Sequence, residues 1–148
     1  MDLVRILSSA TLFKGIEEQE IGQLLPCVEG RTSDFPRDYT IIDEGQYTEE
    51  LGIVLSGAAH IVRHDFWGNR SLVANVGVAQ SFAEALACVN LPSEVSVITV
   101  EPTKILFLNA HKLITTCEKG CPFHNVLIDN MVRLLSLKNL ELMKKITH

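Results

Sequence analysis

A carboxyl group in a small, helix-prone segment is the first candidate for chemistry in this sequence. Glu84 stands in the run Phe82-Ala83-Glu84-Ala85-Leu86, and a second carboxyl, Glu94, follows ten residues later. The run favours a short helix that is not stable alone. Strand-like residues follow on both sides of a turn at residues 101–104. A short helix held between strands points the free N–H groups of its first turn into a cavity, which suits an anion.

Neither carboxyl has the neighbours that catalysis requires. No nucleophile, base or oxyanion donor accompanies Glu84 or Glu94 in the sequence, and no Ser-His-Asp or nucleophile-elbow signature is present. A jelly-roll isomerase or dioxygenase would need a His/Glu metal triad on its strands, which is not evident. We therefore predict that the chain is not an enzyme.

A second candidate site combines two thiols and an imidazole. Cys117, Cys121 and His124 form a C-x3-C motif with a histidine three residues later. Thiolate and imidazole are zinc ligands, but zinc sites usually have four ligands at tighter spacing. The main prediction is therefore no metal, with the thiols packed beneath the helix that follows. The alternative is a thiol- or metal-based redox sensor that uses these three residues.

Composition limits the classes of protein to which the chain can belong. Its 148 residues, 47% hydrophobic and 21% charged, suit one domain with a real core. The net charge of −5 argues against DNA binding by this segment itself, since DNA-binding surfaces are basic. No apolar run approaches the ~20 residues of a membrane span, and the N-terminus has no signal-peptide pattern. We expect a cytoplasmic protein that makes no membrane contact.

The hydrophobic pattern predicts a mainly β fold with flanking helices. Helices are predicted over residues 3–25, with a break at 11–16 and an end at Pro26. Short strands then follow one another, separated by turns, over residues 28–32, 39–42, 51–57, 58–64, 71–76, 95–100 and 105–108. Many short strands at near-regular spacing indicate a β-roll or jelly roll.

Two aromatic residues, Phe66 and Trp67, fall at a predicted hairpin tip over residues 65–70. Exposed aromatic side chains are disfavoured unless they cover something. We expect them to pack on the C-terminal helix or on a second subunit. The alternative is contact with a ligand lid or with a DNA-binding domain that lies outside this chain.

A long helix is predicted over residues 123–146, and Pro122 suits its first turn. Apolar residues recur along it at intervals near seven, which is typical of a helix that pairs with its own copy. The residues predicted to form this dimer interface are Ile128, Met131, Leu135 and Leu142. Lys138 and Asn139 interrupt the stripe near its middle, where a polar residue either sets the register or faces a ligand.

The segment around Glu84 resembles the phosphate-binding cassette of the cyclic-nucleotide-binding domain, as found in the bacterial family of the cyclic-AMP receptor protein and the fumarate–nitrate regulator. Residues 82–86 match that family's Phe-Gly-Glu, small residue and leucine, with alanine at the glycine position. Weaker family motifs at residues 12–16, 41–45 and 51–57 occur in the family's order. The resemblance covers nearly the whole chain, from about Leu12 to Ile146.

The resemblance implies a sensory function. It implies a double-stranded β-helix (jelly roll) with N-terminal helices at residues 1–121 and a dimerisation helix at residues 122–148. In the whole protein a helix-turn-helix domain is expected to follow, so that the chain is either a fragment or a natural sensor-only protein. A small effector bound in the β-roll would shift the dimer helices and change the affinity of the appended domain for DNA.

The ligand-binding residues implied by the resemblance are Phe82, Ala83, Glu84, Ala85, Ser93, Glu94, Val95, Lys138 and Asn139. Cyclic-nucleotide-binding members have an Arg-Ser pair about ten residues after the glutamate, where this chain has Ser93-Glu94 or Glu94-Val95. A buried cyclic phosphate needs a cationic partner, normally a bidentate arginine. We therefore predict that the effector is not cyclic AMP, with Lys138 as the candidate for the missing positive charge. A dimerisation module without any ligand is a further alternative.

Overall fold

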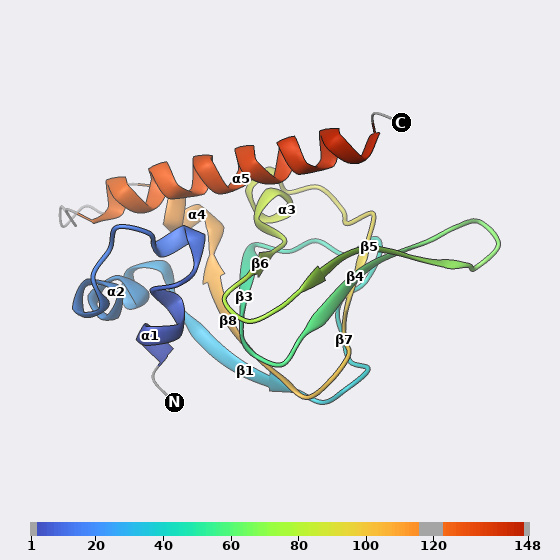
Figure 1. The fold of residues 1–148 in the computed structure, drawn as a ribbon, viewed down its shortest axis with the longest axis horizontal. Coiled ribbons are helices and arrows are strands. Elements are labelled where there is room, and N and C mark those ends of the chain that lie inside the picture. Colours follow the sequence, from blue (N-terminus) through green and yellow to red (C-terminus); the bar gives the residue numbers. More distant parts are fainter. Residues whose placement is uncertain (1–2, 116–122, 147–148) are drawn as a thin grey trace.

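A computed structural model describes residues 3–115 and 123–146 of the chain (Figure 1). Its helices are α1 (Leu3–Leu7), the 3-10 helix η1 (Thr11–Phe13), α2 (Glu18–Leu24), the 3-10 helix η2 (Leu25–Val28), α3 (Glu84–Val89), α4 (Ala110–Ile114) and α5 (His124–Ile146). Its strands are β1 (Arg31–Phe35), β2 (Thr40–Ile42), β3 (Glu50–Ser56), β4 (Ala59–His64), β5 (Arg70–Val76), β6 (Ser81–Phe82), β7 (Ser96–Thr99) and β8 (Thr103–Asn109).

The strands form two four-stranded antiparallel sheets, with the strand orders β1-β8-β3-β6 and β2-β7-β4-β5. The chain passes back and forth between the sheets, which is the winding of a jelly roll. Helices α1 and α2 lie at one end of the roll, and α5 runs across it above α3 (Figure 1). The predicted mainly β jelly roll with flanking helices and a long C-terminal helix is confirmed. Among the described residues, no helix is long and apolar enough to span a bilayer.

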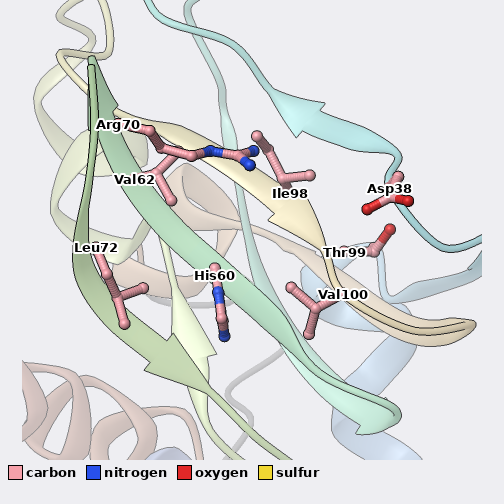
Figure 2. Close-up of a pocket in the computed structure, with 8 residues that line it drawn as sticks. All are labelled: Asp38, His60, Val62, Arg70, Leu72, Ile98, Thr99 and Val100. Atoms are coloured by element: carbon pink, nitrogen blue, oxygen red, sulfur yellow. The ribbon is translucent and has the colours of Figure 1, made fainter. Parts of the chain in front are cut away.

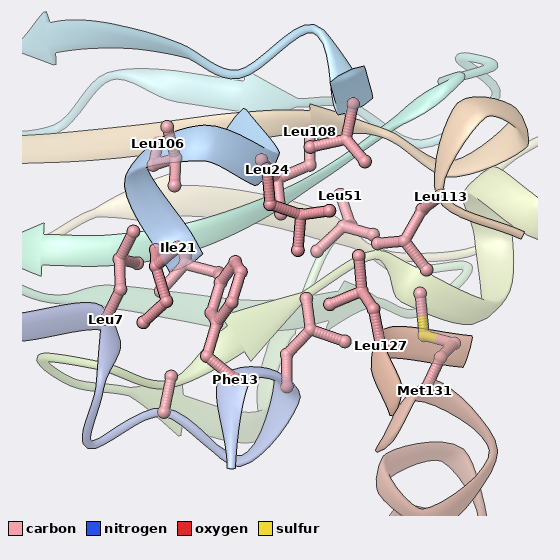
Figure 3. Packing of buried hydrophobic residues seen from close by; sticks show 14 of the residues in the cluster. Leu7, Phe13, Ile21, Leu24, Leu51, Leu106, Leu108, Leu113, Leu127 and Met131 are labelled. Carbon is pink, nitrogen blue, oxygen red and sulfur yellow. The ribbon is translucent and has the colours of Figure 1, made fainter. Parts of the chain in front are cut away.

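Two apolar clusters hold these elements together. The larger one joins the N-terminal helices, the outer face of the first sheet and the start of α5, with Phe13 and Leu51 fully buried near its centre (Figure 3). The smaller one lies between the sheets, where the rings of Phe82 and Phe107 meet edge to face at 6.5 Å. The sheet that carries β3 and β8 is therefore covered on both faces, which explains the nearly continuous apolar sequence of these strands.

The turn after β3 requires glycine. Gly57 has a φ of +88°, and a Cβ atom added to it would collide with the backbone carbonyl of Pro102 and lie 2.6 Å from Oγ1 of Thr103. The Thr103 hydroxyl also lies within hydrogen-bond distance of two carbonyl oxygens, 2.7 Å from Glu101 O and 3.1 Å from Ala58 O. The Ser-Gly pair therefore lies in the β3–β4 turn, at the point where this turn packs on the β7–β8 turn.

Strand β1 begins three residues later than the sequence pattern predicts. Pro26 does not end the N-terminal helices, because it occupies the first turn of η2, where a proline is well tolerated. Glu29 then adopts the left-handed conformation with a φ of +54°. The Gly30 N–H donates to Leu25 O at 2.9 Å, so the chain enters the sheet only after this turn.

The hairpin tip between β4 and β5 is a hydrogen-bonded turn that carries two exposed rings. Phe66 and Trp67 are 93% and 83% exposed, so the prediction that they pack on the C-terminal helix is wrong for the single chain. Their rings meet edge to face at 5.4 Å. Asp65 Oδ1 accepts hydrogen bonds from the backbone N–H groups of Asn69 and Trp67, both at 2.8 Å, and these bonds lower the pKa of Asp65. Contact of the rings with a second subunit stays a prediction.

One face of α5 packs on the roll of its own chain. Leu127, Met131 and Leu134 are buried in the larger cluster. Asn130 donates from Nδ2 to the backbone carbonyls of Leu12 at 2.9 Å and Lys14 at 2.8 Å. The first half of the helix is therefore fixed to the N-terminal helices by packing and by hydrogen bonds.

A second apolar stripe on α5 faces outward, and we call it the seam. Its members are Ile128 and Leu135, which are half-buried, together with Val132 and Leu142, which are exposed. Met131 is only 2% exposed in the single chain, so it has almost no surface left for a second copy, and Val132 takes its place in the outward pattern. The reason is the helical period, because residues 131 and 132 point about 100° apart.

Candidate functional site

The site predicted from the sequence is built by β6 and α3, and we call residues 81–89 the cassette. Phe82 is fully buried and pairs with Gly52 of β3 in the antiparallel ladder, which anchors the cassette to the first sheet. Ala83 joins the strand to the helix with a φ of +65°, in the left-handed region that glycine adopts without strain. The alanine at the family's glycine position therefore keeps the backbone conformation for which glycine is suited.

An ion pair joins the cassette to α5. Lys138 Nζ donates to both carboxylate oxygens of Glu84, at 2.9 and 2.8 Å, and to the backbone carbonyl of Ser81 at 2.6 Å. The Glu84 side chain is 6% exposed and that of Lys138 is 41% exposed. An ammonium has three N–H donors, so these contacts use all of them. Sequence reasoning placed both residues at the site but did not find that they bind each other, nor the role of the Ser81 carbonyl.

The segment where the family's Arg-Ser pair stands is occupied by local hydrogen bonds. Ser93 is buried, and its hydroxyl donates to Val95 O at 2.6 Å and accepts from the Val95 N–H at 3.2 Å. The Ser93 backbone also bonds to the turn at residues 45–46, through Gly45 N–H at 2.7 Å and Gln46 O at 2.8 Å. Glu94 is exposed. Its carboxylate is therefore solvated, so the charge that replaces an arginine here is screened by water.

The cassette helix also holds a thiol of low reactivity. Cys88 is half-buried and packs against the larger cluster, as the core interpretation of this cysteine predicts. Burial raises the pKa of the Cys88 thiol, and the nearby negative charge of Glu84 raises it further. A thiol with a raised pKa is protonated at neutral pH and is a weak nucleophile and metal ligand.

The structure brings together only part of the predicted ligand-binding set. Phe82, Ala83, Glu84 and Lys138 meet at the cassette, whereas Ala85 and Glu94 are exposed. Asn139 is also exposed, and it points about 100° away from Lys138 around the helix. The local chemistry is thus one buried carboxylate that is already paired with an ammonium, with no second cation bound to it among the described residues.

A family model described as "Cyclic nucleotide-binding domain" matches residues 32–119, which is more than half of the chain. The chain belongs to the cyclic nucleotide-binding domain family. The matched region contains the jelly roll from the second residue of β1 to the end of β8, and with it the cassette. The family match points to a regulatory sensor domain.

Two curated relatives show that this domain occurs in larger proteins. The chain is 26% identical over 133 residues to the rice protein "Potassium channel KAT1", a match that covers 90% of the chain and 18% of the channel. It is 33% identical over 79 residues to the "CRP-like cAMP-activated global transcriptional regulator" of Mycobacterium tuberculosis, covering 53% of the chain and 34% of the regulator. The matches therefore span about a third of these relatives or less.

Solved structures have the same cyclic nucleotide-binding fold at low sequence identity. The catabolite activator protein of Thermus thermophilus superposes with a TM-score of 0.75 at 20% identity, covering 91% of this chain and 60% of that one. A regulatory subunit of a "cAMP-independent protein kinase A" from Trypanosoma cruzi, titled as bound to guanosine, has a TM-score of 0.69 at 16% identity and covers 90% of this chain and 43% of its own. These likenesses establish the fold.

The alternative metal site falls largely outside the described residues. Cys117 and Cys121 lie in the segment 116–122, which the structure does not describe, while His124 begins α5. His124 is 2% exposed, and its Nε2 lies 2.6 Å from Leu113 O, whereas its buried Nδ1 has no hydrogen-bond partner among the described residues. Within residues 3–115 and 123–146, no group of three or more His, Cys, Asp or Glu side chains is arranged to hold a metal.

A hollow of about 170 Å³ lies elsewhere, on the outer face of the second sheet (Figure 2). It is lined by Asp38, His60, Val62, Arg70, Leu72, Ile98, Thr99 and Val100. The side chains of His60 and Ile98, which pair across β4 and β7, point away from the interior residues Ala59 and Val97. This hollow is therefore separate from the cassette of the cyclic nucleotide-binding domain.

Proposed function

We propose that this chain is the effector-sensing and dimerisation domain of a regulatory protein. A small molecule binds at the cassette, and the change is passed through α5 to a domain that follows it. The observation that carries this proposal is the contact of Lys138 on α5 with Glu84 and Ser81 of the cassette. Because this contact joins the ligand-binding element directly to the helix, anything that alters one of them alters the other.

The output that we propose is transcription. The similarity to the "CRP-like cAMP-activated global transcriptional regulator" supports a helix-turn-helix domain after α5 in the whole protein. The net charge of −5 supports DNA contact through that domain and not through this one. The seam supports a homodimer in which two copies of α5 pair, with residues 1–121 as the sensor and 122–148 as the dimerisation helix. We expect such a protein to act in the cytoplasm.

The effector that fits the cassette carries hydroxyl groups and no phosphate. No arginine occurs between Arg70 and Arg133 in the sequence, and the one cation at the cassette, among the described residues, is bound to Glu84. A cyclic phosphate would add a second negative charge beside a buried carboxylate, which is unfavourable. Hydroxyl donors, in contrast, hydrogen-bond well to a carboxylate. The neighbour titled as cAMP-independent and bound to guanosine supports a nucleoside as the first probe.

Thermal unfolding with added ligands tests this proposal. The chain is measured alone and with ~1 mM guanosine, adenosine, cyclic AMP or cyclic GMP. A ligand present at a hundred times its dissociation constant adds about 2.7 kcal/mol and raises the midpoint by several degrees. We expect a nucleoside to raise the midpoint and cyclic AMP to leave it unchanged, and titration calorimetry then measures the affinity. A clear rise with cyclic AMP alone would contradict the proposed ligand class.

A second candidate function is a thiol- or metal-based sensor that uses Cys117, Cys121 and His124. The buried Nδ1 of His124, which has no hydrogen-bond partner within residues 3–115 and 123–146, supports it, since such an imidazole nitrogen is available as a metal ligand. Metal analysis of protein purified without chelators tests this candidate. Stoichiometric zinc that is lost in Cys117→Ser would favour it over the cassette, and metal-free protein would exclude a metal-based sensor.

A further inference from the structure

The contact between Lys138 and Glu84 has the geometry of an occupied binding site. Glu84 presents both carboxylate oxygens, and Ser81 presents its carbonyl oxygen, to one point where the ammonium of Lys138 lies within 2.6–2.9 Å of all three. These are the distances of charge-assisted hydrogen bonds. The three acceptors all belong to the cassette, whereas the donor comes from a helix more than fifty residues later in the chain.

The two partners differ in how firmly they are held. Glu84 belongs to α3 and its side chain is 6% exposed, so its position is determined by the roll. The Lys138 side chain is 41% exposed, so it is much less enclosed than its partner. Among residues 136–145 of α5, Lys138 alone is half-buried and the others are exposed. Lys138 belongs to neither apolar cluster, so its departure removes no buried apolar contact from them.

From this asymmetry we infer that Lys138 is a tethered occupant of the effector's place at Glu84. This inference rests on the proposed function in one respect, namely that the effector binds at the cassette. A buried carboxylate without a partner is strongly unfavourable, so an incoming molecule must bring its own hydrogen-bond donors to replace the ammonium. The effector group that contacts Glu84 is thus a donor-bearing one, either a pair of hydroxyls or an ammonium. Lys138 excludes small molecules that lack such donors.

Displacement has a mechanical consequence for α5. Leu127, Met131 and Leu134 lie on the inward face of the helix, and the same spacing brings Lys138 to the next inward position. When the lysine leaves, the second half of α5 loses the contact of its one half-buried side chain with the cassette. Lys145 Nζ still lies 3.5 Å from Val73 O farther along the helix. Binding at Glu84 and loss of the contact between Lys138 and the cassette are therefore the same event.

Replacement of the tethered ammonium by a free one tests the inference without knowledge of the effector. The variant Lys138→Ala leaves the Glu84 carboxylate without its ammonium partner. The matched control Arg133→Ala removes an exposed cation from the same helix. Amide hydrogen exchange is followed at α3 and in the second half of α5. We expect exchange in Lys138→Ala to be faster by about tenfold or more, since a buried charge is left unpaired, and in Arg133→Ala to be unchanged.

Addition of n-butylammonium chloride, which supplies the same ammonium on a similar stem, is expected to restore slow exchange in Lys138→Ala. Tetramethylammonium, which has the charge but no N–H donors, is expected not to restore it. The double variant Glu84→Gln/Lys138→Ala is expected not to respond to either salt. If Lys138→Ala folds poorly, n-butylammonium must increase its folded fraction and tetramethylammonium must not.

Two results would overturn the inference. One is unchanged exchange in Lys138→Ala, and the other is equal rescue by tetramethylammonium. Failure of the proposed function is distinguishable from both, because it would appear as no nucleoside binding by the unmodified chain. In that case rescue by n-butylammonium would still establish an exchangeable donor site at Glu84.

Discussion

The ring of Phe82 lies against Gly52 so closely that a Cβ atom added to Gly52 would overlap the ring carbons Cζ and Cε1. Both residues are buried, and they are paired in the β3–β6 ladder that anchors the cassette. Gly52 therefore provides the space that lets Phe82 enter the cluster between the sheets. A methyl group at residue 52 must displace this ring and with it the cassette.

The first prediction is that Gly52→Ala lowers the free energy of unfolding by about 1–3 kcal/mol, which is the usual cost of an overpacked core. Gly22→Ala is the matched control, because Gly22 is exposed on α2 and an added Cβ meets nothing within 4 Å. There alanine is expected to stabilise by about 0.5–1 kcal/mol through its helix propensity. Urea unfolding measures both changes in the free energy of unfolding. If Gly52→Ala stabilised the chain as Gly22→Ala does, Gly52 would not be needed to make room for Phe82.

The second prediction concerns the strained alanine at the start of α3. Ala83→Gly is expected to raise the free energy of unfolding by about 0.5–1 kcal/mol, because glycine adopts the φ of +65° without the steric cost of a Cβ. Ala85→Gly, in the exposed first turn of the same helix, is expected to lower it by about 0.5–1 kcal/mol. Urea unfolding of the two variants should therefore give shifts of opposite sign. A destabilised Ala83→Gly would mean that the methyl group contributes more by packing than it costs in strain.

The third prediction concerns the reactivity of Cys88. Burial and the Glu84 charge raise the pKa of this thiol, so at a given pH it has less thiolate than an unperturbed cysteine. Alkylation of Cys88 by iodoacetamide, followed by peptide mass spectrometry, is expected to be slower in the folded chain than in urea at every pH from 7 to 9. The pH at which the rate reaches half its maximum is expected to lie above the ordinary value of about 8.5.

Glu84→Gln provides the control for the electrostatic part of this shift. Removal of the charge is expected to lower the pKa of Cys88 partway, so that alkylation at pH 8 becomes faster while burial still slows it. A rate in folded protein equal to the rate in urea would show that the thiol is not protected by the cassette. A rate unchanged by Glu84→Gln would assign the whole shift to burial.

Local patterns in the sequence predicted most of the helices and strands, with errors at some ends such as the start of β1, but they did not predict contacts between distant residues. The strand run that ends in Ser56-Gly57 was placed correctly, because turn chemistry and side-chain periodicity are local. The short helix predicted from Phe82 onward exists but begins at Glu84, because Phe82 pairs with β3 in strand β6. Met131 was assigned to the dimer stripe because periodicity does not tell which of two apolar faces is covered by the chain itself. The pairing of Lys138 with Glu84 joins residues 54 positions apart, and only the packing of α5 on the roll reveals it.

The last prediction concerns self-association through the seam. Ile128, Val132, Leu135, Asn139 and Leu142 follow one another at alternating steps of four and three residues, which is the spacing of a helix that pairs with a copy of itself. Val132 and Leu142 are 61% and 50% exposed in the single chain, so a partner has apolar area to cover. Val132→Glu and Leu142→Glu are each expected to weaken self-association by tenfold or more, since a charge would be buried there.

Leu140→Glu is the matched control for this prediction, because Leu140 is 59% exposed but lies on the opposite side of α5 from Leu142. Sedimentation velocity over a range of protein concentrations measures the dissociation constants of all three variants. Asn139 is a polar residue that lies between Leu135 and Leu142 on the same side of the helix as the seam. Asn139→Leu is expected to tighten association, since such a polar residue sets register at a cost in stability. If Leu140→Glu weakens association as much as Leu142→Glu, the copies pair through another face of α5, and the seam would not be the dimer interface.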